Sequence, residues 1–328
     1  MYKVIAMAAA LSILFSCKPG NKGNGTTTGS SDTAKTPTQP AMKAPDFNAD
    51  SAYMYVQKQV DFGPRVPGTD AHARCALYLY NQLKTYCDNA SIQQAQAQTW
   101  DKKTIPIKNI IGEINPEAAT RIVLFAHWDT RPIAEQDTKD KDKPILGAND
   151  GGSGIGVLLE IARQLHLKRP DIGVDIIFFD SEDWGNTSID HSFCLGSQYW
   201  GRNPHKPDYK ATYGIGLDMV GAPNATFLME GFSKQVAGEV QQKVWQTANK
   251  LGHYNYFMFQ DYGAIIDDHY YVNNLRGIPT IDIIHLKPGG GFGDFWHTHD
   301  DDMDVIDRNT LKAVGETLLA VIYSEKGS

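Results

Sequence analysis

The sequence predicts an α/β fold: a three-layer sandwich in which helices flank a central, mostly parallel, twisted sheet. Continuous apolar runs such as IVLFA (122–126) and DIIFF (175–179) are typical of parallel strands that are buried on both faces. Helical segments alternate with these runs along the chain, as expected of a parallel sheet with helices on both faces. Polar side chains follow the runs directly, where ligands bind in open α/β sheets.

Taken in chain order, the apolar and periodic segments place the elements of this fold. We expect strands over 107–114, 121–128, 174–180, 212–220 and 278–285. Helices are expected over 50–61, 69–87, 152–168, 233–251, 266–276 and 309–323. No internal repeat or second linker interrupts this series, so we expect residues 46–328 to form a single catalytic α/β domain.

The amino-terminal residues 1–16 have the pattern of a signal peptide. Lys3 precedes an apolar stretch, and Ser16 stands before Cys17. Leu14 to Cys17 resembles a bacterial lipobox, which implies a lipid on Cys17 and a periplasmic, membrane-anchored protein of the cell envelope. An ordinary cleaved signal peptide with an incidental cysteine is the alternative.

After Cys17, residues 18–45 are rich in Gly, Ser, Thr, Lys and Pro, so we expect a flexible tether. The net charge of the whole chain is −7 and no basic stripe appears, which argues against nucleic acid as a partner. We take a monomer as the working expectation. Cys75, Cys87 and Cys194 show no zinc-ligand spacing, and we expect them to be free.

Acids and histidines follow several of the predicted strands. His127 ends one apolar run, Glu182 and Asp183 follow another, and Asp218 lies at the end of a third. Because the carboxyl ends of parallel strands meet at one edge of a sheet, these side chains should converge. Buried charges cost several kcal/mol unless they are paired or bound to a metal, so we interpret the cluster as a chemical site.

Two further motifs extend this site. Asp150 precedes a Gly-rich turn that opens the helix expected at 152–168; taken alone, it would be a plain helix N-cap. The motif FWHTHDDD places His297 and His299 beside Trp296 and several carboxylates. Neutral imidazole is a preferred zinc ligand, and a nearby carboxylate commonly fixes its tautomer. We therefore predict that His297 binds a metal.

As a set, the motifs HWD, ANDGGSG, DSED, LDMVGAP, IIDDH, GIP and WHTHDD resemble the zinc-dependent aminopeptidase clan. Within that clan the chain most resembles the glutaminyl cyclases (glutaminyl-peptide cyclotransferases), and the pairing of Glu182 with Asp183 is a pattern of the bacterial type. The resemblance extends over essentially everything after the tether. It implies an enzyme that converts the N-terminal glutamine of peptides and proteins to pyroglutamate and releases ammonia.

The resemblance also implies roles for individual residues. One zinc ion would be bound by Asp150, Asp183 and His297. Glu182 matches the general acid/base, and Asp218 and Asp267 match a pair of acids beside the metal. The substrate pocket would be formed by Trp296 and His127 and by Trp184 or Phe193, between which the sequence does not choose.

Two alternatives remain open. His127 and Asp218 also match ligands of a second zinc, which would make the chain a two-zinc aminopeptidase that hydrolyses N-terminal residues. A non-catalytic binding lipoprotein on the same scaffold is the other alternative, although the chain retains the full set of ligand types.

For Asp267, the plainer interpretation is a residue that starts the helix expected at 266–276.

Overall fold

The structure is a computed structural model that describes residues 42–327. The predicted signal peptide, Cys17 and all but the last four residues of the predicted tether lie outside the described residues. Within those four residues, the side chains of Met42 and Ala44 pack partly buried against the hydrophobic core. Residues 42–45 therefore belong structurally to the domain rather than to a tether.

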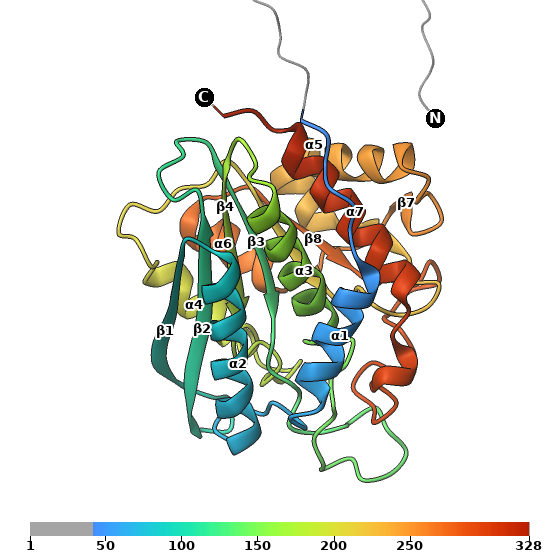
Figure 1. Cartoon of the computed structure of the whole chain (residues 1–328). Coiled ribbons are helices and arrows are strands. Elements are labelled where there is room, and N and C mark those ends of the chain that lie inside the picture. The colour runs from blue at the N-terminus through green and yellow to red at the C-terminus, as the bar shows by residue number, and fades with distance from the viewer. Residues whose placement is uncertain (1–41, 328) are drawn as a thin grey trace, which may run out of the picture. The chain divides into compact units, whose positions relative to one another are not determined.

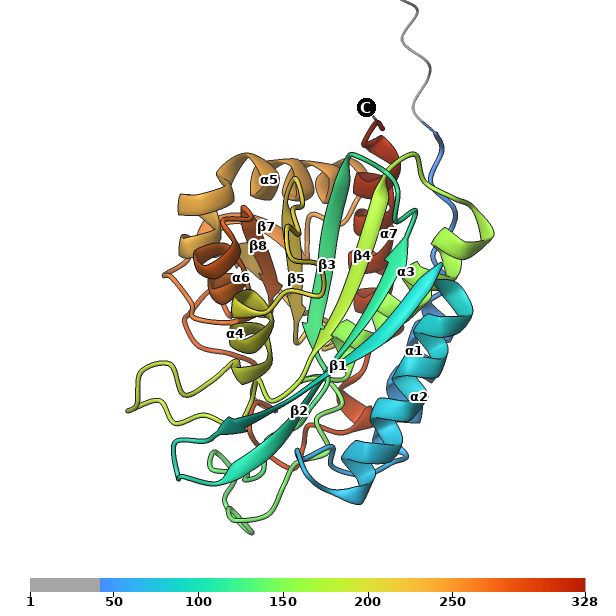
Figure 2. The same ribbon diagram turned by 90° about the vertical axis from the view of Figure 1, so that its left-hand side faces the viewer.

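A six-stranded sheet forms the centre of the domain, in the order β1-β2-β4-β3-β5-β8 (Figure 2). Its strands are β1 (Asn89–Gln98), β2 (Thr104–Ile114), β3 (Arg121–His127), β4 (Gly173–Phe179), β5 (Gly214–Asp218) and β8 (Thr280–Ile284). The pairs β3–β4, β3–β5 and β5–β8 are parallel, and β2 is antiparallel to both of its neighbours. Only β2 thus runs against the other strands, and the mostly parallel sheet is confirmed.

The central strands are apolar throughout because both of their faces are covered. Along β3, Leu124 points into the main core, whereas its neighbours Val123 and Phe125 belong to a smaller cluster on the opposite face. The same alternation places Phe178 and Phe179 of β4 on opposite faces. Successive side chains of a strand point to opposite faces, so burial of both faces yields a continuous hydrophobic run.

Helices cover the two faces of the sheet and complete the three layers (Figure 1). On the main-core face lie α1 (Ala49–Val60), α2 (Asp70–Tyr86), α3 (Ser153–Leu167) and α7 (Arg308–Ser324). The opposite face carries α4 (Leu195–Arg202) and α6 (Asp268–Arg276). Helix α5 (Gly231–Lys250) packs against both β8 and α7. A short 3-10 helix, η1 (Met303–Val305), precedes α7.

Besides the short η1, four elements are absent from the sequence-based expectation. Strand β1 consists mainly of Gln, Ala and Asn, is largely exposed, and pairs only with β2 at the edge of the sheet, so no apolar run marks it. Helix α4 has only eight residues and two glycines. Strands β6 (Phe227–Met229) and β7 (Phe257–Asp261) form a separate two-stranded sheet beside α5. Short or polar elements such as these lack the periodicity on which such predictions depend.

The cysteines and the helices add two smaller findings. Cys75, Cys87 and Cys194 are free, as predicted. In residues 42–327, none of the helices combines the length and the apolar character that a membrane span requires.

Candidate active site

The functional side chains lie where the parallel strands end. His127 is the last residue of β3, Asp218 is the last residue of β5, and Glu182 and Asp183 follow β4 after a two-residue turn. Asp150 lies in the connection between β3 and α3. The helix N-cap of α3 is Gly152, which makes no side-chain hydrogen bond, so Asp150 is not a plain N-cap.

Asp150, Asp183 and His297 form a first triad. Their potential ligand atoms all lie within 4.8 Å of one another, and all three residues are buried. His297 Nε2 lies 3.3 Å from Asp183 Oδ1 and 3.7 Å from Asp150 Oδ2. The predicted ligand set is therefore brought together by the fold.

The first triad also fits a metal ion chemically. Asp183 Oδ2 is buried without a hydrogen-bond partner among the described residues. Burial, together with the neighbouring Asp150 carboxylate, raises the pKa of Asp183 above its ordinary value. Two carboxylates and one imidazole are a donor set that zinc accepts, and a dication would offset the repulsion between the acids.

His127, Asp150 and Asp218 form a second triad that shares Asp150 with the first. His127 Nε2 lies 3.0 Å from Asp150 Oδ1 and 3.3 Å from Asp218 Oδ1. Burial lowers the pKa of His127, but the surrounding carboxylates of Asp129, Asp150 and Asp218 outweigh it and raise the pKa well above its usual range. The imidazole thus lies between the two acids as a hydrogen-bonding partner.

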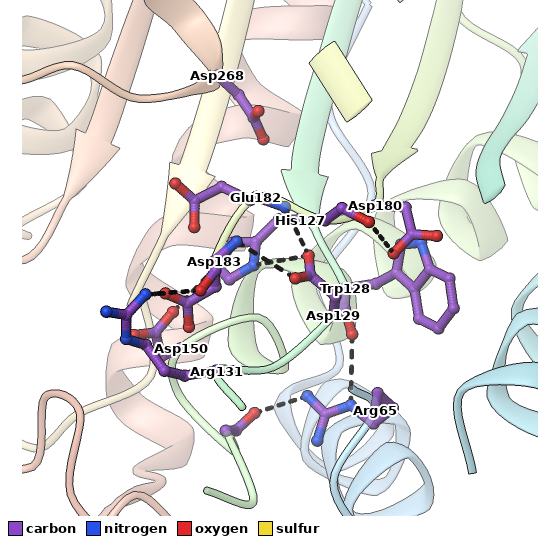
Figure 3. Close-up of polar contacts among 12 residues, drawn as sticks. Arg65, His127, Trp128, Asp129, Arg131, Asp150, Asp180, Glu182, Asp183 and Asp268 are labelled. Atoms are coloured by element: carbon purple, nitrogen blue, oxygen red, sulfur yellow. Dashed lines mark hydrogen bonds and ion pairs between the residues drawn. The ribbon is translucent and has the colours of Figure 1, made fainter. Parts of the chain in front are cut away.

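Two buried carboxylates hold the backbone of these segments in place. Asp129 accepts hydrogen bonds from the amides of Glu182 (2.9 Å) and Asp183 (3.2 Å), as Figure 3 shows. Asp301, in the motif after His297, accepts hydrogen bonds from Asn149 N (2.7 Å) and Asp150 N (3.0 Å). The positions of the acidic pair and of Asp150 are therefore fixed through their main chains.

A cavity of about 180 Å³ opens onto the site. Its polar lining consists of Asp150, Glu182, Asp183, Thr187, Asp218, Asp267 and His297. Its apolar walls include Phe193, Ile265, Phe292 and Trp296. Trp296 stacks on the ring of His297, with centroids 3.8 Å apart. The space is small, and its aromatic walls can exclude water from one bound residue.

The acids of the cavity have unequal affinities for protons. Burial and the nearby Asp183, Asp267 and Asp268 raise the pKa of Glu182 well above its ordinary value. Burial, with Asp150 and Asp267, raises the pKa of Asp218 to about 7 despite its contact with His127. A carboxyl whose pKa lies near 7, as that of Asp218 does, can both take up and release a proton at neutral pH.

Some predicted pocket residues lie elsewhere. Phe193 lines the cavity, whereas Trp184 does not: it is buried under the ammonium group of Lys103, which lies 5.3 Å from the ring centroid. His127 lies behind the cavity, among the acids of the second triad, and is not part of the lining either. Asp267 lines the cavity and is also the N-cap of α6, so its position is compatible with both interpretations.

Sequence reasoning missed several supporting residues. Arg131 and Glu135 lie in the polar segment 131–147, hereafter the insert, and Glu135 contacts His297. No periodicity marks the insert, and its charges resemble those of any exposed loop. Cys194, the residue before α4, places its thiol 3.3 Å from Glu182 Oε1. Only the three-dimensional contacts identify these residues.

Together, the three-layer α/β fold and the acid–histidine cluster at the ends of its strands define the class, a metal-dependent α/β enzyme. The chain belongs to peptidase family M28, whose sequence model matches residues 109–322. This assignment agrees with the resemblance to the zinc aminopeptidase clan on which the sequence-based prediction depended.

Individual similar proteins show which kinds of M28 family member this chain resembles. A glutaminyl cyclase from Bacteroides thetaiotaomicron, solved with N-acetylhistamine, shares 50% identity and a TM-score of 0.85; the match covers 87% of this chain and 100% of that one. A Zn-dependent exopeptidase from Parabacteroides distasonis shares the same identity and TM-score over 86% of this chain and 100% of that one. The glutaminyl-peptide cyclotransferase of Bos taurus is 28% identical over 241 residues, and the match spans 64% of each chain.

Proposed function

We propose that this protein is a glutaminyl-peptide cyclotransferase that converts N-terminal glutamine to pyroglutamate and releases ammonia. The observation that carries the proposal is the small cavity in which Glu182 and the first triad meet aromatic walls formed by Phe193 and Trp296. Such a space suits one terminal residue better than an extended peptide. The similarity to structures described as bacterial glutaminyl cyclases supports the same activity.

One zinc ion would be held by Asp150, Asp183 and His297, and when bound it supplies Lewis-acid polarisation of an amide carbonyl. Glu182 accepts a proton from the substrate's α-amine as the amine nitrogen attacks the γ-carbonyl carbon. A new carbon–nitrogen bond closes the lactam ring. Glu182 then delivers the proton to the departing nitrogen, which leaves as ammonia.

The other residues of the cavity prepare this step. Asp218 and Asp267 line the same cavity as Glu182, and Asp218, with its raised pKa, can donate a hydrogen bond to the oxygen of a substrate amide. The hydrogen bonds to Asp129 keep the Glu182 backbone fixed. Trp296 and Phe193 confine the glutamine side chain, which brings amine and amide close together and favours the intramolecular reaction.

The test is incubation of the protein with a short peptide that begins with glutamine, followed by ammonia assay and mass spectrometry. Loss of one ammonia from an otherwise intact peptide supports cyclisation. Release of a free amino acid contradicts it and favours a peptidase. Metal analysis of the purified protein checks for one equivalent of zinc.

A two-zinc aminopeptidase is the second candidate, and the second triad favours it. His127 and Asp218 lie close enough to Asp150 for the three to share a cation, which would make Asp150 a bridging ligand. The outer contacts support the one-zinc alternative, because Glu135 fixes the ring of His297 through Nδ1, whereas His127 Nδ1 has no hydrogen-bond partner among the described residues.

In the cell, the protein would act in the envelope, on the periplasmic side, anchored as a monomer through a lipid on Cys17. The apolar residues before Cys17 and the Gly-, Ser- and Thr-rich segment after it support export followed by tethering. Labelled fatty acid should enter the full-length protein when it is made in a bacterium and should not enter the Cys17→Ser variant. Equal labelling of both would contradict the anchor.

A further inference from the structure

The insert contacts two members of the first triad and ends shortly before the third. Glu135 contacts His297, Arg131 contacts Asp183, and Asp150 lies three positions after Gly147, the last residue of the insert. The insert is also fastened along its length: Gln136 N donates to His297 O (3.3 Å), and Asp137 Oδ2 accepts from His299 N (2.9 Å). One polar segment, with no role in the proposed reaction, thus contacts two of the three proposed metal ligands.

Glu135 determines how His297 presents its ring. His297 Nδ1 donates to Glu135 Oε1 over 2.8 Å, so Nε2 is the nitrogen without a proton in the neutral ring. Nε2 is also the nitrogen that faces Asp183 and Asp150. The hydrogen bond therefore selects the tautomer that can bind a cation at the first triad and fixes the plane of the imidazole.

Arg131 connects Glu135 to the other side of the triad. Its side chain is 5% exposed, and its Nε and Nη2 donate to the Glu135 carboxylate over 2.7 to 3.0 Å. Its Nη1 donates to the backbone oxygens of Asp183 (2.7 Å) and Gly185 (3.2 Å) and lies 3.4 Å from Asp183 Oδ1. One guanidinium thus holds both the partner of His297 and the main chain that carries Asp183.

We propose that Arg131 and Glu135 are positioning residues that preset the zinc site, Glu135 by orienting His297 and Arg131 by holding Glu135 and Asp183 together. The insert is then a brace for the metal centre rather than a lid over the substrate. This inference depends on the zinc ligands of the proposed function. It concerns metal affinity, which can be measured without any turnover.

The experiment is a zinc titration of metal-free protein against a chromophoric chelator. Glu135→Gln keeps the shape and an acceptor oxygen but removes the charge, and we expect zinc to dissociate about 10- to 100-fold more readily. Arg131→Lys, which cannot make the forked contact, should weaken zinc binding in the same direction. Because Arg131 acts partly through Glu135, the double variant should lose less than the two single losses combined.

Asp142→Asn is the matched control, since Asp142 is an exposed acid of the same insert and the substitution removes the same charge. It should bind zinc as the unmodified protein does. Thermal unfolding of the metal-free variants separates a positioning role from a role in folding. A positioning role predicts weaker zinc binding, while the unfolding temperature of the metal-free protein stays nearly unchanged.

Zinc affinity of Glu135→Gln within about twofold of the unmodified protein would overturn the inference, as would equal weakening in Asp142→Asn. His297→Ala is measured alongside. If it loses zinc while Glu135→Gln does not, the brace is wrong and the ligand set stands. If His297→Ala binds zinc normally, the ligand set itself is wrong.

Discussion

The two triads share Asp150 and use the same residue types, yet they are built differently. In the first, the histidine directs one nitrogen to Glu135 outside the triad and the other toward the acids. In the second, His127 Nε2 lies within 3.3 Å of both carboxylates of its own triad. Both histidines thus approach their acids through Nε2 at similar distances, and only His297 has a carboxylate hydrogen-bonded to its other nitrogen.

The different partners of the two histidines indicate that proximity of acids and histidines is not sufficient to define a metal site. What distinguishes the two sets is the outer layer of contacts. His297 has a carboxylate partner that frees its other nitrogen for a cation. For His127, Nδ1 lies 3.5 Å from Asp129 Oδ1, and Asp129 is already engaged by two backbone amides. One zinc per chain is therefore the expectation that this comparison supports.

Removal of the histidine of the first triad should have the largest effect. We expect His297→Ala to weaken zinc binding by more than about 100-fold, beyond the range typical of outer contacts, and to lose cyclase activity with it. Metal analysis after dialysis and the ammonia assay measure the two effects. Full zinc content in this variant would contradict the assignment of the first triad.

A substitution of Glu182, the proposed acid/base residue, should separate turnover from metal binding. Glu182→Gln should lower kcat by about 100- to 10,000-fold, because the amide can neither accept nor deliver the transferred proton. Zinc content should remain at the unmodified level. Glu117→Gln is the control and should keep full activity, because it alters an exposed glutamate between β2 and β3 that does not line the cavity. Retained turnover in Glu182→Gln would remove Glu182 from this role.

The histidine of the second triad tests the comparison directly. His127→Asn should leave one zinc bound and lower kcat on the order of tenfold, equivalent to the loss of one charge-assisted hydrogen bond to Asp218. If the unmodified protein binds two equivalents and this variant binds one, the second triad is a metal site. The aminopeptidase alternative would then be the better description.

Most of the site could be predicted because it lies at the ends of strands with strong signals. The runs before His127, Glu182 and Asp218 are buried on both faces, and their continuous apolar character reveals both the strands and their polar ends. The convergence of the three follows from parallel pairing alone.

The remaining features depend on contacts that no local pattern encodes. Glu135 lies 162 positions from His297 in the chain, in a segment that is neither periodic nor apolar. Trp184 and Phe193 are equally plausible pocket residues by type, and only the course of the loop places Phe193 at the cavity. Strand β1 has no apolar run, and only its pairing with β2 identifies it as a strand. Long-range geometry determined each of these outcomes.

The contact between Glu230 and His269 differs from both triads because several backbone and hydroxyl groups already bind its acid. Glu230, fully buried, accepts hydrogen bonds from Phe232 N, Ser233 N, Ser233 Oγ and Ile265 N, and it lies 3.2 Å from His269 Nε2. Burial raises the pKa of this carboxyl, but the contacts with His269 and Ser233 outweigh it and hold the pKa at about 2. Its oxygens are already engaged by protein donors.

This contact should therefore affect stability rather than zinc, and the effect should be the smallest of the series. Because the folded pKa of Glu230 lies below its ordinary value of 4.5, its stabilisation is present above about pH 4.5 and is lost as the pH falls toward 2. Glu230→Gln should lower the free energy of unfolding at pH 7 on the order of 1–3 kcal/mol. Zinc content should not change.

Urea unfolding at pH 7 and pH 3 measures this effect. The control is Glu239→Gln, which alters an exposed acid of α5, the helix whose N-cap is Glu230. The gap between Glu230→Gln and the unmodified protein should narrow at the lower pH, because protonation removes the same charge that the substitution removes. An equal gap at both values would mean that Glu230 stabilises through shape alone. Loss of zinc from Glu230→Gln would instead show that this contact affects the first triad from a distance. The difference between the two triads would then depend on more than the residues in direct contact with each histidine.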